Sequence, residues 1–250
     1  MKTFLSETDF ILLEMLNPWA ILLIIVGMTV SYVARKLTLM ASIAGGVVAA
    51  LCYLGADFTG LSMLGAFFIL ASIATRIRIT QKQVDGLAET GNGRRNVGQV
   101  IANGGVAAFV CALSVLMPGY QPSLEMIAAA SLSAAAADSV SSEIGNAFGS
   151  KFINVLSFKT DKKGLDGVIS PEGTLAGLIA SLVIALIYAI GVDWNVNFIY
   201  IVAGGTAGNF FDSFLGAYFE RKHLLDNNHV NFLNTAFGAM VAFILMVVFG

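Results

Sequence analysis

Two carboxylates and three hydroxyls follow a run of small apolar residues between positions 134 and 145. The stretch reads Ala-Ala-Ala-Ala-Asp-Ser-Val-Ser-Ser-Glu-Ile-Gly. In helical geometry Asp138, Ser141, Ser142 and Gly145 stand at i, i+3, i+4 and i+7, so they share one face. A face this small and this polar is not an ordinary core stripe, and its oxygens are the hard ligands that suit Mg²⁺. We interpret the stretch as part of a site that handles phosphate.

A second polar stripe begins with two arginines that follow Gly-Asn-Gly at positions 91–93. Arg95, Gln99 and Asn103 are spaced by four residues and therefore form one helix face. Backbone donors at a helix start favour an anion, and the guanidinium groups of Arg94 and Arg95 can bind phosphate oxygens in pairs. The alternative is a cytoplasmic charge anchor with hydrogen bonds between helices. Anchoring explains the arginines but not the two amides.

Acidic residues within or beside apolar runs are the third signal. Asp138, Glu143 and Asp212 lie inside such runs, and Glu172 lies at the entrance to one. Placing a carboxylate in a membrane helix costs roughly 2.5–3.5 kcal/mol, so acids there are candidates for function. We predict that these four carboxylates are ligands of Mg²⁺. The alternative is that they join neighbouring helices or reach water at a helix end.

The loop before the sixth apolar run allows two interpretations. Ser170 can cap a helix that begins at Pro171, which is a purely structural role. In the functional interpretation, Glu172 binds a cation while Gly173 and Thr174 contact phosphate.

Two further pairs are weaker signals. Asp212-Ser213 repeats the Asp-Ser order of positions 138–139 near the end of another apolar run. Asn231 and Asn234 stand at i and i+3 where the last run begins, and they either line the same cavity or mark the membrane interface.

The composition indicates the elements that must position these groups. The chain has 250 residues, of which 57% are hydrophobic and 12% are charged, about half the charge of a soluble domain. Such a chain can cross a membrane several times. We predict one integral membrane domain over residues 1–250, an all-α bundle of about eight spans. The spans are Pro18–Ala34, Leu37–Leu54, Leu61–Thr75, Val97–Met117, Ser123–Ile144, Thr174–Ile190, Val196–Phe219 and Phe232–Gly250.

The distribution of basic residues gives this bundle an orientation. Of the 14 lysines and arginines, only Lys2 falls on one side of the predicted membrane, and all others fall on the opposite side. Positive charge accumulates on the cytoplasmic side, so both termini are expected outside and the long loops 76–96 and 146–171 inside. We expect a multi-pass protein of the cell membrane whose site faces the cytoplasm.

Several familiar motifs are missing from the sequence. There is no G-x-x-x-x-G-K-[ST] loop and no dinucleotide fingerprint. His223 and His229 are the only histidines, and both lie in a basic loop. Cys52 and Cys111 lie in apolar runs and are interpreted as small core residues. Acids, amides, hydroxyls and arginines remain, and this set is sufficient for phosphoryl transfer, which depends on positioning and charge neutralisation. No nucleic acid is expected as a partner.

Taken in order, these motifs resemble a known integral membrane family, the one that includes the phytyl-phosphate kinase of tocopherol synthesis. The resemblance is carried by the segments Gly93–Asn96 with Gln99–Gly105, Asp138–Gly145, Gly167–Thr174, Asp212–Ala217, and Asn231 with Asn234. A more distant likeness joins residues 138–145 and 171–176 to the CTP-dependent dolichol and phytol kinases. In that group a lysine usually precedes Glu-Gly-Thr, and here only the loop residues Lys159, Lys162 or Lys163 could replace it.

The resemblance implies a kinase that adds a second phosphate to a prenyl monophosphate such as phytyl or geranylgeranyl phosphate, with CTP as the expected donor. The catalytic residues would be Asp138, Arg95 and Asp212. The groups that bind substrate or nucleotide would be Arg94, Asn96, Gln99, Asn103, Ser139, Ser142, Ser170, Gly173, Thr174, Ser213, Asn231 and Asn234. Expected partners are the nucleotide, the isoprenoid monophosphate and membrane lipid, and a homo-oligomer is an open alternative to a monomer.

Two other functions are compatible with the same sequence. A CTP-dependent polyprenol kinase or a cytidylyltransferase would use similar groups on another acceptor, and an alcohol acceptor would need a general base, for which Asp138 is the candidate. A small ion-coupled transporter would use the buried acids to carry ions. A transporter should place polar groups towards both membrane faces, whereas here nearly all are expected at one.

Overall fold

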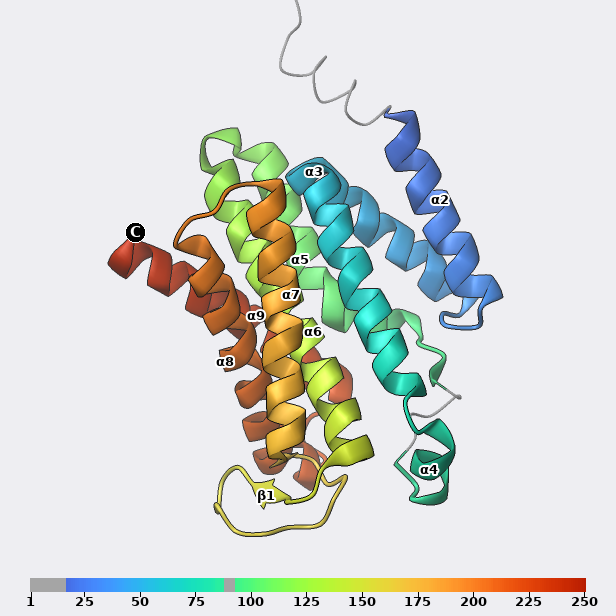
Figure 1. The fold of residues 1–250 in the computed structure, drawn as a ribbon. Coiled ribbons are helices and arrows are strands. Elements are labelled where there is room, and N and C mark those ends of the chain that lie inside the picture. The colour runs from blue at the N-terminus through green and yellow to red at the C-terminus, as the bar shows by residue number, and fades with distance from the viewer. Residues whose placement is uncertain (1–16, 88–92) are drawn as a thin grey trace, which may run out of the picture.

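A computed structural model of the protein describes residues 17–87 and 93–250. Within these ranges the chain is almost entirely helical, as predicted (Figure 1). The helices are α2 (Pro18–Val33), α3 (Leu39–Arg76), α4 (Ile79–Val84), α5 (Val97–Leu116), α6 (Gln121–Phe148), α7 (Pro171–Gly191), α8 (Asn197–Tyr218) and α9 (Asn227–Phe249). Short elements complete the order: η2 (Pro118–Tyr120), β1 (Ile153–Asn154), β2 (Val168–Ile169) and η3 (Glu220–Lys222). The expected position of the N-terminus falls outside the described residues.

The number of membrane crossings is supported only in part. By length and apolar composition, four of the described helices can span a membrane, namely α3, α5, α7 and α9, while α2 is apolar but shorter. The predicted count of eight is therefore not supported by this criterion. The physical reason is that α6 consists largely of small residues, and that α6 and α8 both carry polar residues and carboxylates within their length, such as Asp138 and Asp212.

Helix α3 contains the largest departure from regular geometry among the long helices. Two spans with a connection at 55–60 were predicted, whereas the structure has one element with non-helical backbone only at Ala56 and Asp57. Asp57 has a φ of 49°, a left-handed conformation that is costly for a residue with a side chain. The two arms of α3 meet at this break, and the chain turns back there (Figure 1).

Polar caps fix where several helices begin. A side-chain oxygen accepts a backbone hydrogen bond in the first turn of α2, α3, α5, α7 and α9, and the capping residues are Asn17, Thr38, Asn96, Ser170 and Asp226. Each such cap stabilises a helix by about 1 kcal/mol. These five helices therefore start at defined residues.

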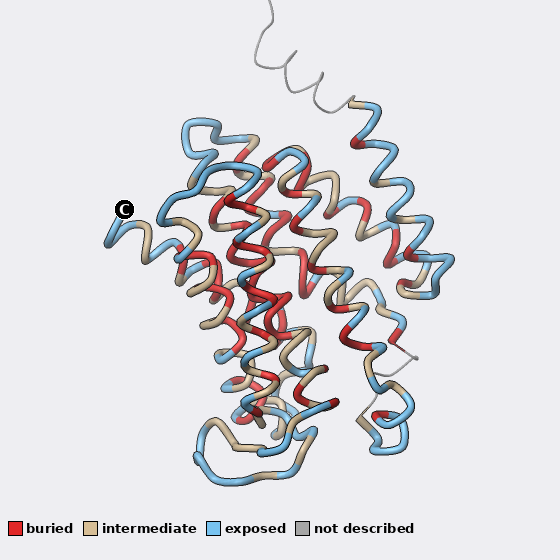
Figure 2. The backbone as a smooth tube through the Cα atoms, in the orientation of Figure 1, coloured by how far each residue is buried: buried red, intermediate tan, exposed pale blue. Residues whose placement is uncertain are grey.

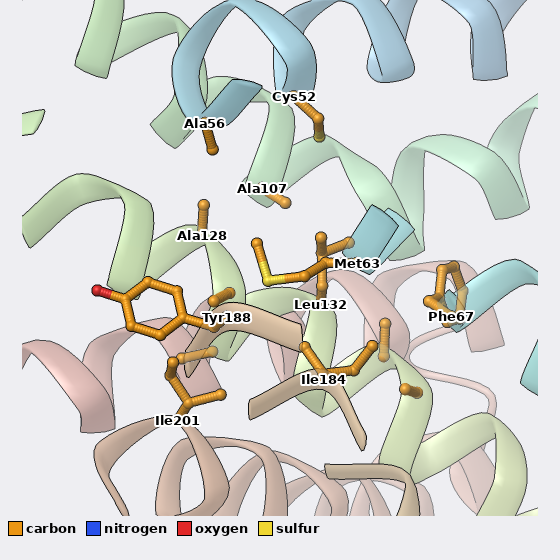
Figure 3. Close-up of a cluster of buried hydrophobic side chains, with 14 of the residues drawn as sticks. Cys52, Ala56, Met63, Phe67, Ala107, Ala128, Leu132, Ile184, Tyr188 and Ile201 are labelled. Atoms are coloured by element: carbon orange, nitrogen blue, oxygen red, sulfur yellow. The ribbon is translucent and has the colours of Figure 1, made fainter. Parts of the chain in front are cut away.

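Helix α6 is the centre of the bundle and packs against α3, α5, α7, α8 and α9. Its four alanines at 134–137 are fully buried, and Figure 2 shows the buried backbone concentrated in the middle of the bundle. The close packing is visible at Gly208 of α8, where an added Cβ would lie 2.6 Å from the Cβ of Ala134. In the apolar core, Met63 and Phe67 of α3 lie near Leu132 of α6 and Ile184 of α7 (Figure 3).

The connection between α6 and α7 folds back under the bundle. Strands β1 and β2 pair antiparallel, with Ile153 opposite Ile169. Gly167 has a φ of 72°, and a Cβ at this position would lie 2.5 Å from the carbonyl oxygen of Ser213 in α8. Only glycine allows this approach, so Gly167 holds the loop against α8. Helix α4 and β1 lie at the same end of the bundle (Figure 1).

Candidate phosphate-binding site

A polar cavity of about 390 Å³ opens at the end of the bundle where β1 and α4 lie. It is lined by the starts of α5, α7 and α9, the last turns of α6 and α8, and the loop between β1 and β2. Most of the residues predicted for the site line this cavity: Arg95, Gln99, Asn103, Asp138, Ser139, Ser142, Glu143, Ser170, Asp212, Ser213 and Asn231. Segments more than 100 residues apart in the sequence therefore meet at one place.

The two aspartates of the repeated Asp-Ser pattern lie next to each other in the lining of this cavity. Asp138 of α6 and Asp212 of α8 lie close enough for their carboxylates to interact directly. Oδ1 of Asp212 is buried without a hydrogen-bond partner. A buried carboxylate oxygen is costly unless something pairs with it, so the pair needs a proton or a cation between its members.

The two arginines point to different parts of the molecule. Arg95 lines the cavity, and its guanidinium carbon lies 5.9 Å from the centre of the Phe67 ring. Arg94 lies outside it, donates from Nε to the carbonyl oxygen of Leu37 at 3.0 Å, and lies over the ring of Tyr32. Both were predicted to clamp phosphate, but only Arg95 lies in the cavity lining, because Arg94 is held against Leu37 and Tyr32.

The amides at the start of α5 divide into a structural and a cavity-facing set. Asn96 accepts from the backbone of Gln99 at 3.1 Å, and Oε1 of Gln99 accepts from the backbone of Asn96 at 2.9 Å. This reciprocal cap replaces the substrate contact predicted for Asn96, and it leaves Nε2 of Gln99 as a donor. Asn103 donates to the carbonyl oxygen of Gln99, and its buried Oδ1 has no partner.

Glu143 lines the cavity but is engaged by a residue that the sequence did not single out. Lys82 of α4 is almost fully buried and binds Oε2 of Glu143 together with the carbonyl oxygens of Ala74 and Thr75. This ion pair competes with the metal-ligand role predicted for Glu143. Sequence alone placed Lys82 among the basic loop residues, where no signal separates a buried lysine from a solvated one.

The start of α7 confirms the structural interpretation of its motif. Oγ of Ser170 accepts from the backbone of Gly173 at 3.1 Å and also lines the cavity. Glu172 lies outside the cavity and bonds to the hydroxyl of Ser150, so it is not brought to Asp138 as predicted. Gly173 and Thr174 are not lining residues either, because Gly173 packs against α6 close to the carbonyl oxygen of Ser141.

The asparagines of α9 are separated by the packing of that helix. Asn231 lines the cavity, whereas Asn234 is fully buried between α8 and α9. Neither polar atom of the Asn234 side chain has a hydrogen-bond partner within 3.5 Å, although its amide lies close to Asp212. Asn234 therefore stands behind the cavity wall and can act on a ligand only through Asp212.

Two cavity acids from the loops were missed. Asp166 and Glu220 line the cavity, and the carbonyl oxygen of Asp166 accepts from Nε of Arg221 at 2.6 Å. Burial, followed by the charges of Asp166 and Asp138, raises the pKa of Glu220 to about 7. Burial also raises the pKa of Asp166. The glycines beside Asp166, at 164 and 167, were the signal of a close turn that could have indicated it.

The charge balance of the cavity bears on what it can hold. Its described lining contains the carboxylates Asp138, Glu143, Asp166, Asp212 and Glu220 but a single basic side chain, that of Arg95. The positive ends of α5, α7 and α9 face it and favour an anion. A polyphosphate would still need a cation to offset the acids.

The donor set can be tested against Mg²⁺. Across residues 17–87 and 93–250, no three His, Cys, Asp or Glu side chains form a complete metal-binding group. The predicted set of four carboxylates is therefore not brought together. Mg²⁺ is usually held by one or two carboxylates, waters and substrate phosphates, and the pair of Asp138 and Asp212 fits that requirement.

Comparison with known proteins identifies the family. Residues 21–239 match the family described as Integral membrane protein DUF92. The chain belongs to this family. The segments from which the resemblance was inferred supply most of the cavity lining, so the family's recognisable residues and the geometric site coincide.

Relatives of this DUF92 chain include proteins of a plant and of an archaeon. Protein VTE6, chloroplastic, of Arabidopsis thaliana is 33% identical over 74% of this chain and 58% of its own length. An uncharacterised membrane protein of Methanocaldococcus jannaschii is 33% identical over 82% of each chain. Protein PGR of Arabidopsis thaliana is 24% identical over 82% of this chain and 87% of its own length. The chain thus spans less than two thirds of VTE6. No solved structure matches the chain.

Proposed function

We propose that the protein is a membrane kinase that transfers a phosphoryl group from a nucleoside triphosphate, with CTP as the expected donor, to a prenyl monophosphate. The observation that carries this proposal is the meeting of Arg95, Asp138 and Asp212 in one cavity. One cationic clamp and two neighbouring carboxylates are the parts that phosphoryl transfer between two anions requires. Membership of the DUF92 family and the likeness to VTE6 support the same reaction class.

Each of these cavity residues has a proposed role. Arg95, Gln99 and Asn231 would hold the acceptor phosphate. Asp138 and Asp212 would hold Mg²⁺, which when bound neutralises charge on the donor phosphates. An oxygen of the acceptor phosphate attacks the γ-phosphorus, the bond from that phosphorus to the β–γ bridging oxygen breaks, and the nucleoside diphosphate leaves. The acceptor oxygen is already anionic, so no general base is needed.

We also propose that the site faces the cytoplasm of a chain that crosses the membrane eight times, with both termini outside. In this arrangement α2, the two arms of α3, and α5 to α9 are the crossings. This orientation is supported by the concentration of basic residues in the loops at the end of the bundle where α4 and β1 lie. The position of the polar cavity at one end of the described bundle also favours an enzyme over a transporter, which needs access from both sides.

The deciding experiment incubates purified protein with CTP, Mg²⁺ and geranylgeranyl monophosphate and measures the diphosphate and CDP. Asp138→Asn and Asp212→Asn should each lower the rate about 100-fold or more, since each removes a carboxylate that would hold the Mg²⁺ needed to neutralise the donor phosphates. Asp193→Asn is the matched control, because Asp193 is exposed in the connection between α7 and α8.

Other outcomes assign other functions. If the protein prefers a free prenol as acceptor, it is a polyprenol kinase and not a prenyl-phosphate kinase. Release of pyrophosphate with formation of a CDP-lipid would indicate a cytidylyltransferase. Lack of turnover with every nucleotide, together with ion-coupled uptake in liposomes, would indicate the transporter.

A further inference from the structure

A second cavity lies beside the polar one and differs from it in chemistry. It has a volume of about 270 Å³, is partly open, and is lined by α2, both arms of α3 and the start of α5. Apart from its boundary with the polar cavity, its walls are mostly apolar side chains and glycines, including Leu23, Met28, Leu61, Leu64 and Phe68. Figure 1 shows α2 beside the first arm of α3, at the side of the bundle. The cavity is therefore a space suited to hydrocarbon.

The two cavities share one boundary, formed by Arg95, Gln99 and Asn103. Arg95 lies over the ring of Phe67, which belongs to the apolar side. Asn103 is nine-tenths buried, and its Oδ1 has no partner. Leaving such an atom unpaired costs roughly 1–3 kcal/mol, so a polar group of a ligand or its water is expected at this boundary.

The few hydroxyls inside the apolar cavity do not call for a polar ligand. Ser31 and Ser42 lie 3.3 Å apart and hydrogen-bond to each other, and Ser31 also bonds to the carbonyl oxygen of Met28. Ser62, the third serine of the lining, is exposed and can bond to its surroundings. Nothing else in the cavity carries a charge except Arg95 at its boundary. The occupant should therefore be apolar along its length and anionic at one end.

We infer that the apolar cavity is the binding site for the hydrocarbon tail of the phosphorylated acceptor, with the phosphate at Arg95. This inference rests on the proposed kinase function and adds the place where the acceptor tail is held. The ligand class is a single-chain amphiphile, and its tail lies between α2 and α3 while its phosphate enters the polar cavity. Filling this space sets an upper limit to the tail length.

A competing apolar groove lies between α7 and α8 and is lined by Leu182, Phe198, Val202 and Thr206 among others. It shares no residue with the polar cavity. A tail in that groove would not bring its phosphate to Arg95. Contact with lipid is sufficient to explain this groove, whereas the shared boundary distinguishes the cavity beside α2.

Gly65 of α3 offers a clean way to shorten the tail cavity. It lines the cavity, and a Cβ added there would meet no atom within 4 Å, so a larger side chain would enter open space. Gly105 of α5 is the matched control. It does not line the cavity, and its added Cβ would meet only the side chain of Ile101, at 3.4 Å.

The first experiment compares C10 and C20 prenyl monophosphates as acceptors. Gly65→Leu should lower kcat/KM for the C20 acceptor at least about tenfold, because one misplaced methylene in an apolar pocket costs roughly 10- to 200-fold. The C10 acceptor should change less than about twofold, and Gly105→Leu should leave the ratio of the two acceptors as in the wild type. An unchanged ratio in a folded Gly65→Leu protein would overturn the tail site.

The second experiment does not depend on turnover. A C20 prenyl monophosphate with a terminal diazirine is photolysed with the wild-type protein, and the adducts are mapped by mass spectrometry. Adducts on α2, α3 or α5 that unlabelled C20 monophosphate competes away support the tail site. Adducts confined to α7 and α8, or none that compete, overturn it even if the kinase is active. Adducts at α2 and α3 without kinase activity would retain the tail site and remove the proposed function.

Discussion

Arg94 and Arg95 are neighbours in the sequence, but their guanidinium groups act in different parts of the molecule. Arg95 stands at the boundary of the two cavities, whereas Arg94 is held by the carbonyl oxygen of Leu37. A change of the same chemistry at each position therefore separates phosphate binding from local structure.

We expect Arg95→Gln to lower kcat/KM for phosphorylation of the acceptor about 100-fold, since it removes the basic group of the cavity lining. Arg94→Gln should cost about 1 kcal/mol of stability through its lost hydrogen bond, while turnover per folded molecule stays within about twofold. Steady-state kinetics and thermal unfolding of the two variants are the measurements. Equal losses of activity in both would contradict the assignment.

Glu220 gives the cavity a dependence on pH. Burial raises its pKa from the ordinary value of 4.5 to about 7, so the folded chain retains a proton that the unfolded chain loses earlier. Folding stability consequently falls as the pH rises from 4.5 to 7. We predict that Glu220→Gln matches the wild type at pH 4.5 or below, and exceeds its Tm by about 2 °C at pH 8.

The control for this prediction is to measure the Tm of both proteins with and without Mg²⁺. If the cation offsets the cavity acids, adding it at pH 8 should raise the Tm of the wild type more than that of Glu220→Gln. If the difference in Tm between the two proteins is larger at low pH than at high pH, a group other than Glu220 determines the pH dependence of stability.

At the residue scale, the sequence identified groups whose type is unusual for their surroundings. Asp138 and Asp212 stood out because acids are rare in apolar runs, and both line the cavity. Glu172 was misplaced because the direction of a side chain at a helix start depends on its neighbours, here Ser150. Lys82 was missed because burial of a loop residue is decided by tertiary packing.

Among the elements, α4 is the shortest of the described α-helices and is held by a buried ion pair. Lys82 on α4 pairs with Glu143 on α6, and its side chain is only 1% exposed. Lys163 pairs with Asp85 just after α4, but its side chain is 30% exposed. The two ion pairs fix the same segment in very different surroundings.

We predict that Lys82→Met destabilises the protein by about 3–5 kcal/mol, because it leaves Glu143 charged and unpaired in a buried position. Adding Glu143→Gln should recover much of that loss. Lys163→Met should cost less than about 1 kcal/mol, as is typical of exposed pairs. Thermal unfolding of the detergent-solubilised variants measures all three, and similar effects of Lys82→Met and Lys163→Met would refute the distinction.

Helix positions were predictable where long apolar runs occur. Helices α5, α7, α8 and α9 lie close to their predicted ranges, and all of these except α8 begin at a side-chain cap. The break in α3 was predicted as a longer connection, since only the backbone geometry at Ala56 and Asp57 reduces it to two residues. The pairing of β1 with β2 was not predicted, because two-residue strands carry no periodic signal.

For the whole molecule, membrane topology is the property with the most direct test. Lys163→Cys and Asp193→Cys place single reactive thiols at opposite predicted sides. The native Cys52 and Cys111 are both buried and provide an unreactive background. We expect a membrane-impermeant maleimide to label Asp193→Cys in intact cells and Lys163→Cys only after permeabilisation. Labelling of Lys163→Cys from outside would reverse the proposed orientation.

The backbone of Arg95, just before α5, is hydrogen-bonded to the connection between α2 and α3. Its N–H donates to the carbonyl oxygen of Lys36 at 2.9 Å, and its carbonyl oxygen accepts from the N–H of Thr38 at 3.0 Å. Residues 36–38 connect α2 to α3, so any separation of these two helices would displace the peptide that carries the guanidinium. A tail bound between α2 and α3 would therefore change the position of the Arg95 guanidinium. The length of the tail would then change kcat as well as KM.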